Sequence, residues 1–86
     1  MIYRRLNRFA KAYRMLDDSI KDTVKTKLRL MAQNPFHPSL RTKKVQGKNG
    51  IFEASVNKNI RITWQYGKGG ILLRNIGEHD ETLKNP

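Results

Sequence analysis

The sequence contains no cysteine, which excludes disulfide bonds and any zinc site built on thiolates. A small domain without such cross-links is typical of a reducing compartment, so we expect a cytoplasmic protein. No apolar run approaches the roughly 18 residues that a membrane-spanning helix requires. The first seven residues also lack the apolar stretch of a secretory signal peptide, and we expect no contact with a membrane.

Most catalytic signatures are also missing. The chain has no P-loop, no G-x-G-x-x-G and no H-E-x-x-H motif. Its two histidines, His37 and His79, are far apart in the sequence and make a poor metal site. We therefore expect neither a metal nor an organic cofactor.

Acidic residues are few, and positive charge dominates the composition. Lys and Arg total 18 against 7 Asp and Glu, which gives a net charge of +11 over 86 residues. A polyanion is the natural partner of such a chain, because its binding releases counterions from the phosphates. An acidic protein would satisfy the same electrostatic field, and a basic protein that is merely soluble is the plainer alternative.

The N-terminal half predicts a strand and two helices. Met1–Arg5 reads as a short edge strand. Apolar residues then recur at spacings of three and four, which predicts a first helix; they are Leu6, Phe9, Ala10, Tyr13 and Leu16. Ser19 and Asp22 have the spacing of a capping box and predict the start of a second helix. Its apolar face is Ile20, Val24, Leu28 and Met31. Asn34 and Pro35 end it.

The C-terminal half changes to a period of two, which predicts an antiparallel meander. Three strands are expected near residues 52–56, 60–66 and 71–76, joined by turns at Asn57–Asn59 and Gly67–Gly70. Trp64 and Tyr66 share the apolar face of the middle strand, so we interpret both as core residues. The segment Glu78–Pro86 reads as a polar tail.

These elements predict an α+β fold with a single domain over residues 1–86. An N-terminal strand and two antiparallel helices would pack on one face of a mainly antiparallel sheet. The opposite face would stay open to solvent. The side chains predicted on this open face are Glu53, Arg61, Thr63 and Gln65.

The residues that remain suit metal-free cleavage of RNA, which needs a proton-transfer group and cations around the phosphate. Histidine titrates near neutral pH, so His79 is the candidate for proton transfer, with Asp80 orienting its ring. The alternative is a plain surface histidine. Arg61 is the candidate phosphate ligand; its alternative role is an ion pair with Glu53 across the hairpin.

A basic segment precedes the predicted sheet, and we expect it to contact RNA. Its members are Arg41, Lys43, Lys44 and Lys48. A solvated loop without function is the alternative interpretation of this cluster.

The order of several short motifs resembles the RelE/ParE superfamily of toxins over nearly the whole chain. Two landmarks lie in the helices, Arg8-Phe9-Ala10-Lys11 and Asn34-Pro35. The more specific ones follow in the sheet; they are Lys44-Val45-Gln46-Gly47 with Gly50-Ile51-Phe52, the strand Ile60-Arg61-Ile62-Thr63-Trp64, and the ending Ile76-Gly77-Glu78-His79-Asp80.

The resemblance implies a type II toxin that cleaves messenger RNA in the ribosomal A site and pairs with an acidic antitoxin. Arg61 would be the phosphate-binding arginine, and His79 the position that carries an arginine or a catalytic histidine in the family. Glu53 and Ser55 depart from the pattern, because RelE itself has two catalytic lysines there, and Leu83 replaces a common aromatic. These departures favour a histidine-based, YafQ-like arrangement. A ParE-like inhibitor of DNA gyrase and a basic nucleic-acid-binding module remain as alternatives.

Overall fold

The computed structural model describes all residues, Met1–Pro86. One five-stranded sheet in the order β1-β5-β4-β3-β2 forms its centre. The strands are β1 (Ile2–Arg5), β2 (Lys43–Lys44), β3 (Ile51–Ser55), β4 (Ile60–Gly67) and β5 (Gly70–Glu78). Only β1 and β5 pair in parallel; every other neighbouring pair is antiparallel. The predicted α+β class is confirmed.

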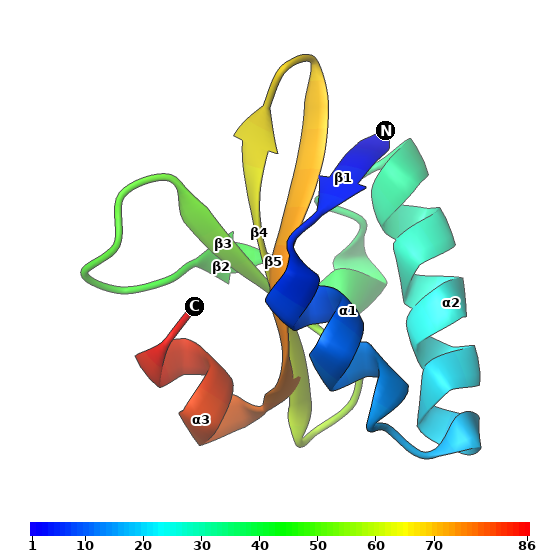
Figure 1. The fold of residues 1–86 in the computed structure, drawn as a ribbon. Coiled ribbons are helices and arrows are strands. Elements are labelled where there is room, and N and C mark those ends of the chain that lie inside the picture. The colour runs from blue at the N-terminus through cyan, green and yellow to red at the C-terminus, as the bar shows by residue number, and fades with distance from the viewer.

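Two helices pack on one face of the sheet, as the periodicity predicts. They are α1 (Asn7–Arg14) and α2 (Asp18–Gln33), which run in opposite directions in Figure 1. A short 3₁₀ helix, η1 (Pro38–Leu40), follows α2. The expected end of α2 at Asn34 is confirmed, but its expected start is wrong. The helix begins at Asp18, after Asp17, and Ser19 and Asp22 form no capping box.

The core lies between these helices and the sheet. Val24 and Met31 of α2 and Phe9 of α1 are buried against Ile62 and Trp64 of β4. Trp64 is the core residue that the alternation predicts, with no exposed surface. The interpretation of Tyr66 as a core residue is wrong, because its exposed fraction is 53%. Tyr66 is the last residue but one of β4, and the β4–β5 hairpin extends beyond the helices (Figure 1).

The predicted polar tail is in fact a helix, α3 (His79–Lys84). The Glu78 side chain accepts hydrogen bonds from the main-chain nitrogen of Asp80 at 2.9 and 3.0 Å, which caps the helix. Asp80 and Glu81 in the first turn and Lys84 in the last suit the helix dipole. These local interactions form the helix that the weak apolar pattern does not predict.

Helix α3 covers part of the sheet face that was expected to be open. Thr82 of α3 is buried. A Cβ atom at position 77 would lie 2.9 Å from Thr82 Oγ1, so the glycine there permits the close approach of α3 to β5. The buried Thr63 Oγ1 donates to the main-chain oxygen of Pro86 at 3.1 Å. Arg8 Nη2 and Arg74 Nε donate to the same oxygen at 2.7 and 3.0 Å. The expectation of an open face is therefore wrong at Thr63 and Glu53, which are both buried.

Candidate functional site

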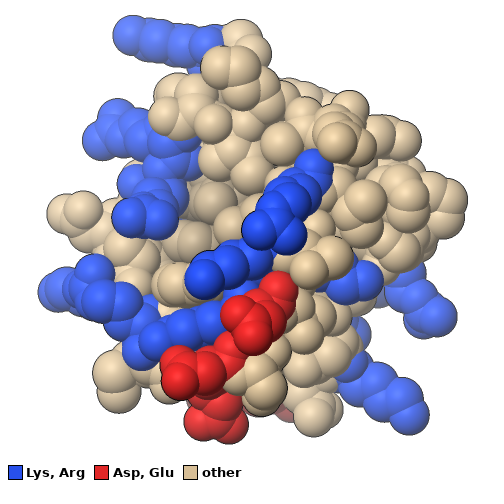
Figure 2. All heavy atoms as spheres, turned by 90° about the vertical axis from the view of Figure 1, so that its right-hand side faces the viewer, with Lys and Arg blue, Asp and Glu red and all other residues tan.

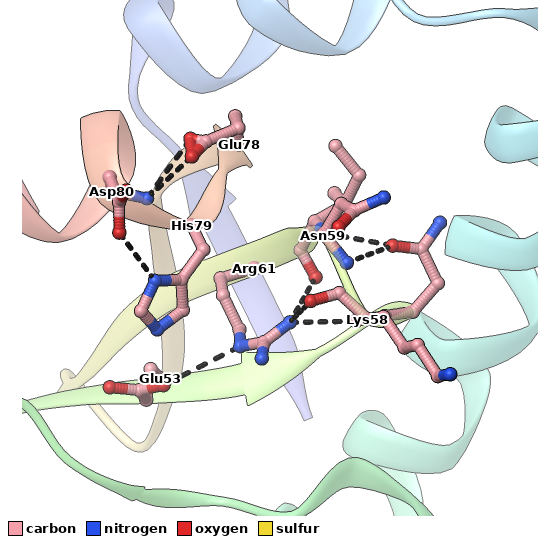
Figure 3. Close-up of polar contacts among 9 residues, drawn as sticks. Glu53, Lys58, Asn59, Arg61, Glu78, His79 and Asp80 are labelled. Carbon is pink, nitrogen blue, oxygen red and sulfur yellow. Dashed lines mark hydrogen bonds and ion pairs between the residues drawn. The ribbon is translucent and has the colours of Figure 1, made fainter.

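The candidate site lies at the corner where the β3–β4 turn meets the start of α3 (Figure 3). The turn Asn57–Asn59 is built by Asn57 Oδ1, which accepts hydrogen bonds from the main-chain nitrogens of Asn59 and Ile60, both at 2.8 Å. This Asx geometry is the usual reason for asparagine in a turn. The turn then fixes two of the predicted site residues, Arg61 and His79.

The Arg61 guanidinium is held on two of its three nitrogens. Nη1 donates to the main-chain oxygens of Asn57, Lys58 and Ile60 at 2.6, 3.2 and 3.2 Å. Nε lies 3.6 Å from Glu53 Oε1, so the predicted alternative of an ion pair across the hairpin is observed. Nη2 takes part in none of these interactions and remains available to a ligand. A preorganised guanidinium with a free edge suits a phosphate oxygen.

His79 lies at the same corner, as the first residue of α3. Its main-chain nitrogen donates to Asn59 O at 2.7 Å, which joins α3 to the turn that also holds Arg61. Its Nδ1 is 3.0 Å from Asp80 Oδ1, and the Asp80 side chain is largely exposed. This bond assigns the proton of a neutral imidazole to Nδ1 and leaves Nε2 as an acceptor.

Two pockets flank Arg61. The larger has a volume of about 360 Å³ and the smaller about 170 Å³. The larger is lined by Lys27, Ser39, Arg41, Ser55, Val56, Asn57, Lys58 and Arg61. The smaller is lined by Arg41, Lys43, Glu53, Ser55 and Arg61. Arg41, Ser55 and Arg61 belong to both, so the two pockets are adjacent compartments of one basic surface.

The structure thus brings together only some of the predicted site residues. Arg41 and Lys43 line pockets with Arg61, whereas Lys44 and Lys48 are exposed and line neither pocket. His79 and Asp80 lie outside both linings, next to the turn that bounds them. Lys27 and Lys58 were missed, because nothing in a helical lysine or a turn lysine marks it as facing a pocket.

Arg8 and Arg74 form a separate cluster of charged groups around the main-chain oxygen of Pro86. Burial, together with the charge of Arg74, lowers the pKa of the Arg8 guanidinium. Both arginines bind the main-chain oxygen of Pro86 and so serve to fix the C-terminal segment.

No group of three or more His, Cys, Asp or Glu side chains is arranged to hold a metal ion. No helix has the length and apolar character needed to span a membrane.

The sequence matches no protein-family model and no curated protein. Solved structures are similar over nearly the full chain. The toxin in the RelB–RelE antitoxin–toxin complex from Methanococcus jannaschii has a TM-score of 0.76 at 17% identity, covering 98% of this chain and 100% of that one. The YoeB/ParE toxin from Agrobacterium tumefaciens has a TM-score of 0.78 at 14% identity, covering 92% and 99%.

A third similar structure is the E. coli DinJ–YafQ toxin–antitoxin complex, with a TM-score of 0.77 at 15% identity, covering 94% of this chain and 93% of that one. All three are toxins by their names, and they share the strand, helix pair and sheet described above. The likeness predicted from the short motifs is confirmed at the level of the fold. This chain has the fold of the RelE/ParE superfamily of toxins.

Proposed function

We propose that this protein is the toxin of a type II toxin–antitoxin system and cleaves messenger RNA on the ribosome. The observation that carries the proposal is the joint attachment of Arg61 and His79 to the turn Asn57–Asn59, beside a basic surface. One residue supplies a fixed cationic fork and the other a proton-transfer group. Cleavage of RNA by its own 2′-hydroxyl needs both.

Arg61 is the proposed ligand of the scissile phosphate. Negative charge builds on the phosphate oxygens as the 2′ oxygen attacks phosphorus, and a preoriented donor stabilises that charge without reorganising. The main-chain oxygens around Nη1 and the carboxylate near Nε already hold the guanidinium in place. The free Nη2 edge then faces the reacting group.

His79 is the proposed general base. With its Nδ1 proton directed at Asp80, Nε2 can accept the proton of the 2′-hydroxyl. The 2′ oxygen forms a bond to phosphorus and the bond to the 5′ oxygen breaks, which gives a 2′,3′-cyclic phosphate and a 5′-hydroxyl. The leaving 5′ oxygen takes a proton, for which Lys43 in the smaller pocket is our candidate donor.

Glu53 and Ser55 support a histidine rather than a lysine as the general base. Both residues line the smaller pocket, and they stand at the two positions where the resemblance to RelE would imply catalytic lysines. Glu53 is instead a buried carboxylate paired with Arg61. Arg41 and Lys43 are the proposed contacts to the RNA backbone within the pockets, and Lys44 and Lys48 provide further positive charge outside them.

An acidic antitoxin is the proposed partner. Two of the similar structures are toxins in complex with their antitoxins, RelB–RelE and DinJ–YafQ. The net charge of +11 and the cations around Arg61 provide the complementary potential for an acidic segment. We expect that segment to cover the Arg61 corner, and co-purification with mutation of Arg61 and Arg41 tests this contact.

Primer extension on messages from induced cells tests the nuclease function. We expect new 5′ ends within translated messages after induction of the wild type and none after induction of the Arg61→Ala variant. Supercoiling by DNA gyrase is measured in the same cells. Intact messages together with loss of supercoiling would overturn the proposal in favour of a gyrase inhibitor.

A further inference from the structure

The larger of the two pockets beside Arg61 has no role in the chemistry proposed above. It lies on the side of Arg61 that faces α2 and η1, and residues from both elements contribute to it. Figure 2, which views the α2 side of the molecule, shows Lys and Arg spread over this face, with the acidic side chains gathered at its lower end. All of the charged residues that line the pocket are basic.

The charges that line this pocket distinguish it from its smaller neighbour. Lys27, Arg41, Lys58 and Arg61 contribute four cations, and no acidic residue is among its lining residues. The smaller pocket contains the carboxylate of Glu53. Like charges gathered around one cavity repel each other, and a bound anion relieves that repulsion. The larger pocket is therefore the better of the two for a phosphate.

Arg41 provides independent support. It is the only residue other than glycine with a positive φ, at 49°, and its ψ of 44° puts it in the left-handed region. For a residue other than glycine, this backbone conformation raises the free energy of the folded state by about 1 kcal/mol. Strain of this kind gathers at functional sites. Arg41 follows η1 directly and lines both pockets, so the strained residue is one whose guanidinium faces the proposed ligand.

Neutral donors complete the pocket. Because Asn57 Oδ1 is occupied by two main-chain nitrogens, the amide Nδ2 is the part of that side chain left to a ligand. The Ser55 hydroxyl forms no hydrogen bond within the protein and lines both pockets. Lys27 Nζ donates to Ser39 O at 3.2 Å, which tethers the ammonium group at the wall formed by η1.

We propose that the larger pocket is a second phosphate site, which binds the phosphate next to the one at Arg61 in single-stranded RNA. This inference rests on the proposed RNA substrate and deepens it. The shared residues Arg41, Ser55 and Arg61 separate the two pockets, so two phosphates of one strand bind on either side of them. Lys27 and Lys58 are the cationic residues that line the second site alone. They position the strand and take no part in bond breaking.

Binding of a short, uncleavable 2′-O-methyl RNA by the purified protein tests this site. A methylphosphonate replaces each linkage flanking the central phosphate in turn, which removes one charge without changing the length of the strand. For the wild type we expect one of these replacements to weaken binding on the order of tenfold, as expected for a charge-assisted hydrogen bond. The double variant Lys27→Met, Lys58→Met should bind the charged and the neutral strand equally.

The matched control is Lys25→Met, because Lys25 is an exposed lysine on the same helix that lines neither pocket. It lowers the net charge but should keep the full preference for the charged linkage. If the double variant retains the wild-type preference, the inference is wrong. If the preference depends on Lys27 and Lys58 but no message is cleaved in cells, the second phosphate site stands and the nuclease function fails.

Discussion

Glu53 Oε1 lies 3.6 Å from Arg61 Nε, and the Glu53 residue is only 5% exposed. The two residues are diagonal neighbours across the β3–β4 hairpin, since Glu53 pairs with Thr63 and Ser55 with Arg61. This carboxylate holds the guanidinium that we propose as the phosphate ligand. It also opposes the entry of a phosphate into the smaller pocket, which it lines. Its two effects on the site are therefore opposite in sign.

Replacing Glu53 by glutamine should separate these effects. We expect Glu53→Gln to bind uncleavable RNA several times more tightly, because a negative charge leaves the pocket. The free energy of unfolding should fall by about 1–3 kcal/mol with the loss of a charged contact to Arg61. The exposed Glu81→Gln variant is the charge-matched control. Weaker RNA binding by Glu53→Gln would mean that orienting Arg61 is the larger effect.

His79→Gln should slow the chemical step without weakening RNA binding. Loss of a general base costs on the order of 10² to 10⁴ in rate. Asp80→Asn should give a smaller loss, because Asp80 orients the imidazole through the 3.0 Å contact and is itself 80% exposed. Single-turnover cleavage on programmed ribosomes measures both variants. Full-speed cleavage by His79→Gln would remove this histidine from the mechanism.

Arg41 and Lys48 provide a test of which basic residues contact the RNA. Each phosphate contact to a single strand contributes about 0.7 to the slope of log affinity against log salt. Arg41 lines both pockets, so Arg41→Ala should lower the slope by about that amount. Lys48 lies in the loop before β3 and lines neither, so Lys48→Ala should change the slope less. Equal slopes for the two variants would contradict the assignment of the pockets.

The packing of α3 on the sheet depends on the absence of a side chain at Gly77. A Cβ there would lie 2.9 Å from Thr82 Oγ1, so Gly77→Ala should destabilise the protein by about 1–3 kcal/mol. Thr82→Ala removes the clashing hydroxyl. Urea unfolding of the double variant should therefore show less destabilisation than the sum of the single changes. Simple additivity would show that the two positions do not interact.

The sequence predicts the three-stranded meander and the α1–α2 pair well, because the spacing of apolar residues in a long segment indicates which of its faces is buried. In β4, Ile62 and Trp64 are buried as the alternation predicts, but Thr63 between them is buried as well. Tyr66 continues the alternation yet is exposed. Burial at the end of a strand depends on how far the covering helices reach, which a local pattern does not contain.

Helix α3 and the second pocket could not be predicted for different reasons. A helix of six residues is too short to be stable alone, and α3 depends on its cap at Glu78 and its packing against Gly77. Acidic residues at its start and Lys84 at its end were the available signal. Lys27 and Lys58 meet only in three dimensions, and no spacing in the sequence relates them.

The central claim is that this chain cleaves RNA by means of the 2′-hydroxyl, with Arg61 and His79 at the reacting phosphate. Its most direct test is cleavage by the purified protein of a message on programmed ribosomes, with and without a single 2′-deoxy nucleotide at the cut site. We expect the ribose message to give a 2′,3′-cyclic phosphate and a 5′-hydroxyl, and the 2′-deoxy message to stay intact at that position. Normal cleavage of the 2′-deoxy message, or no cleavage of either message, would contradict the account.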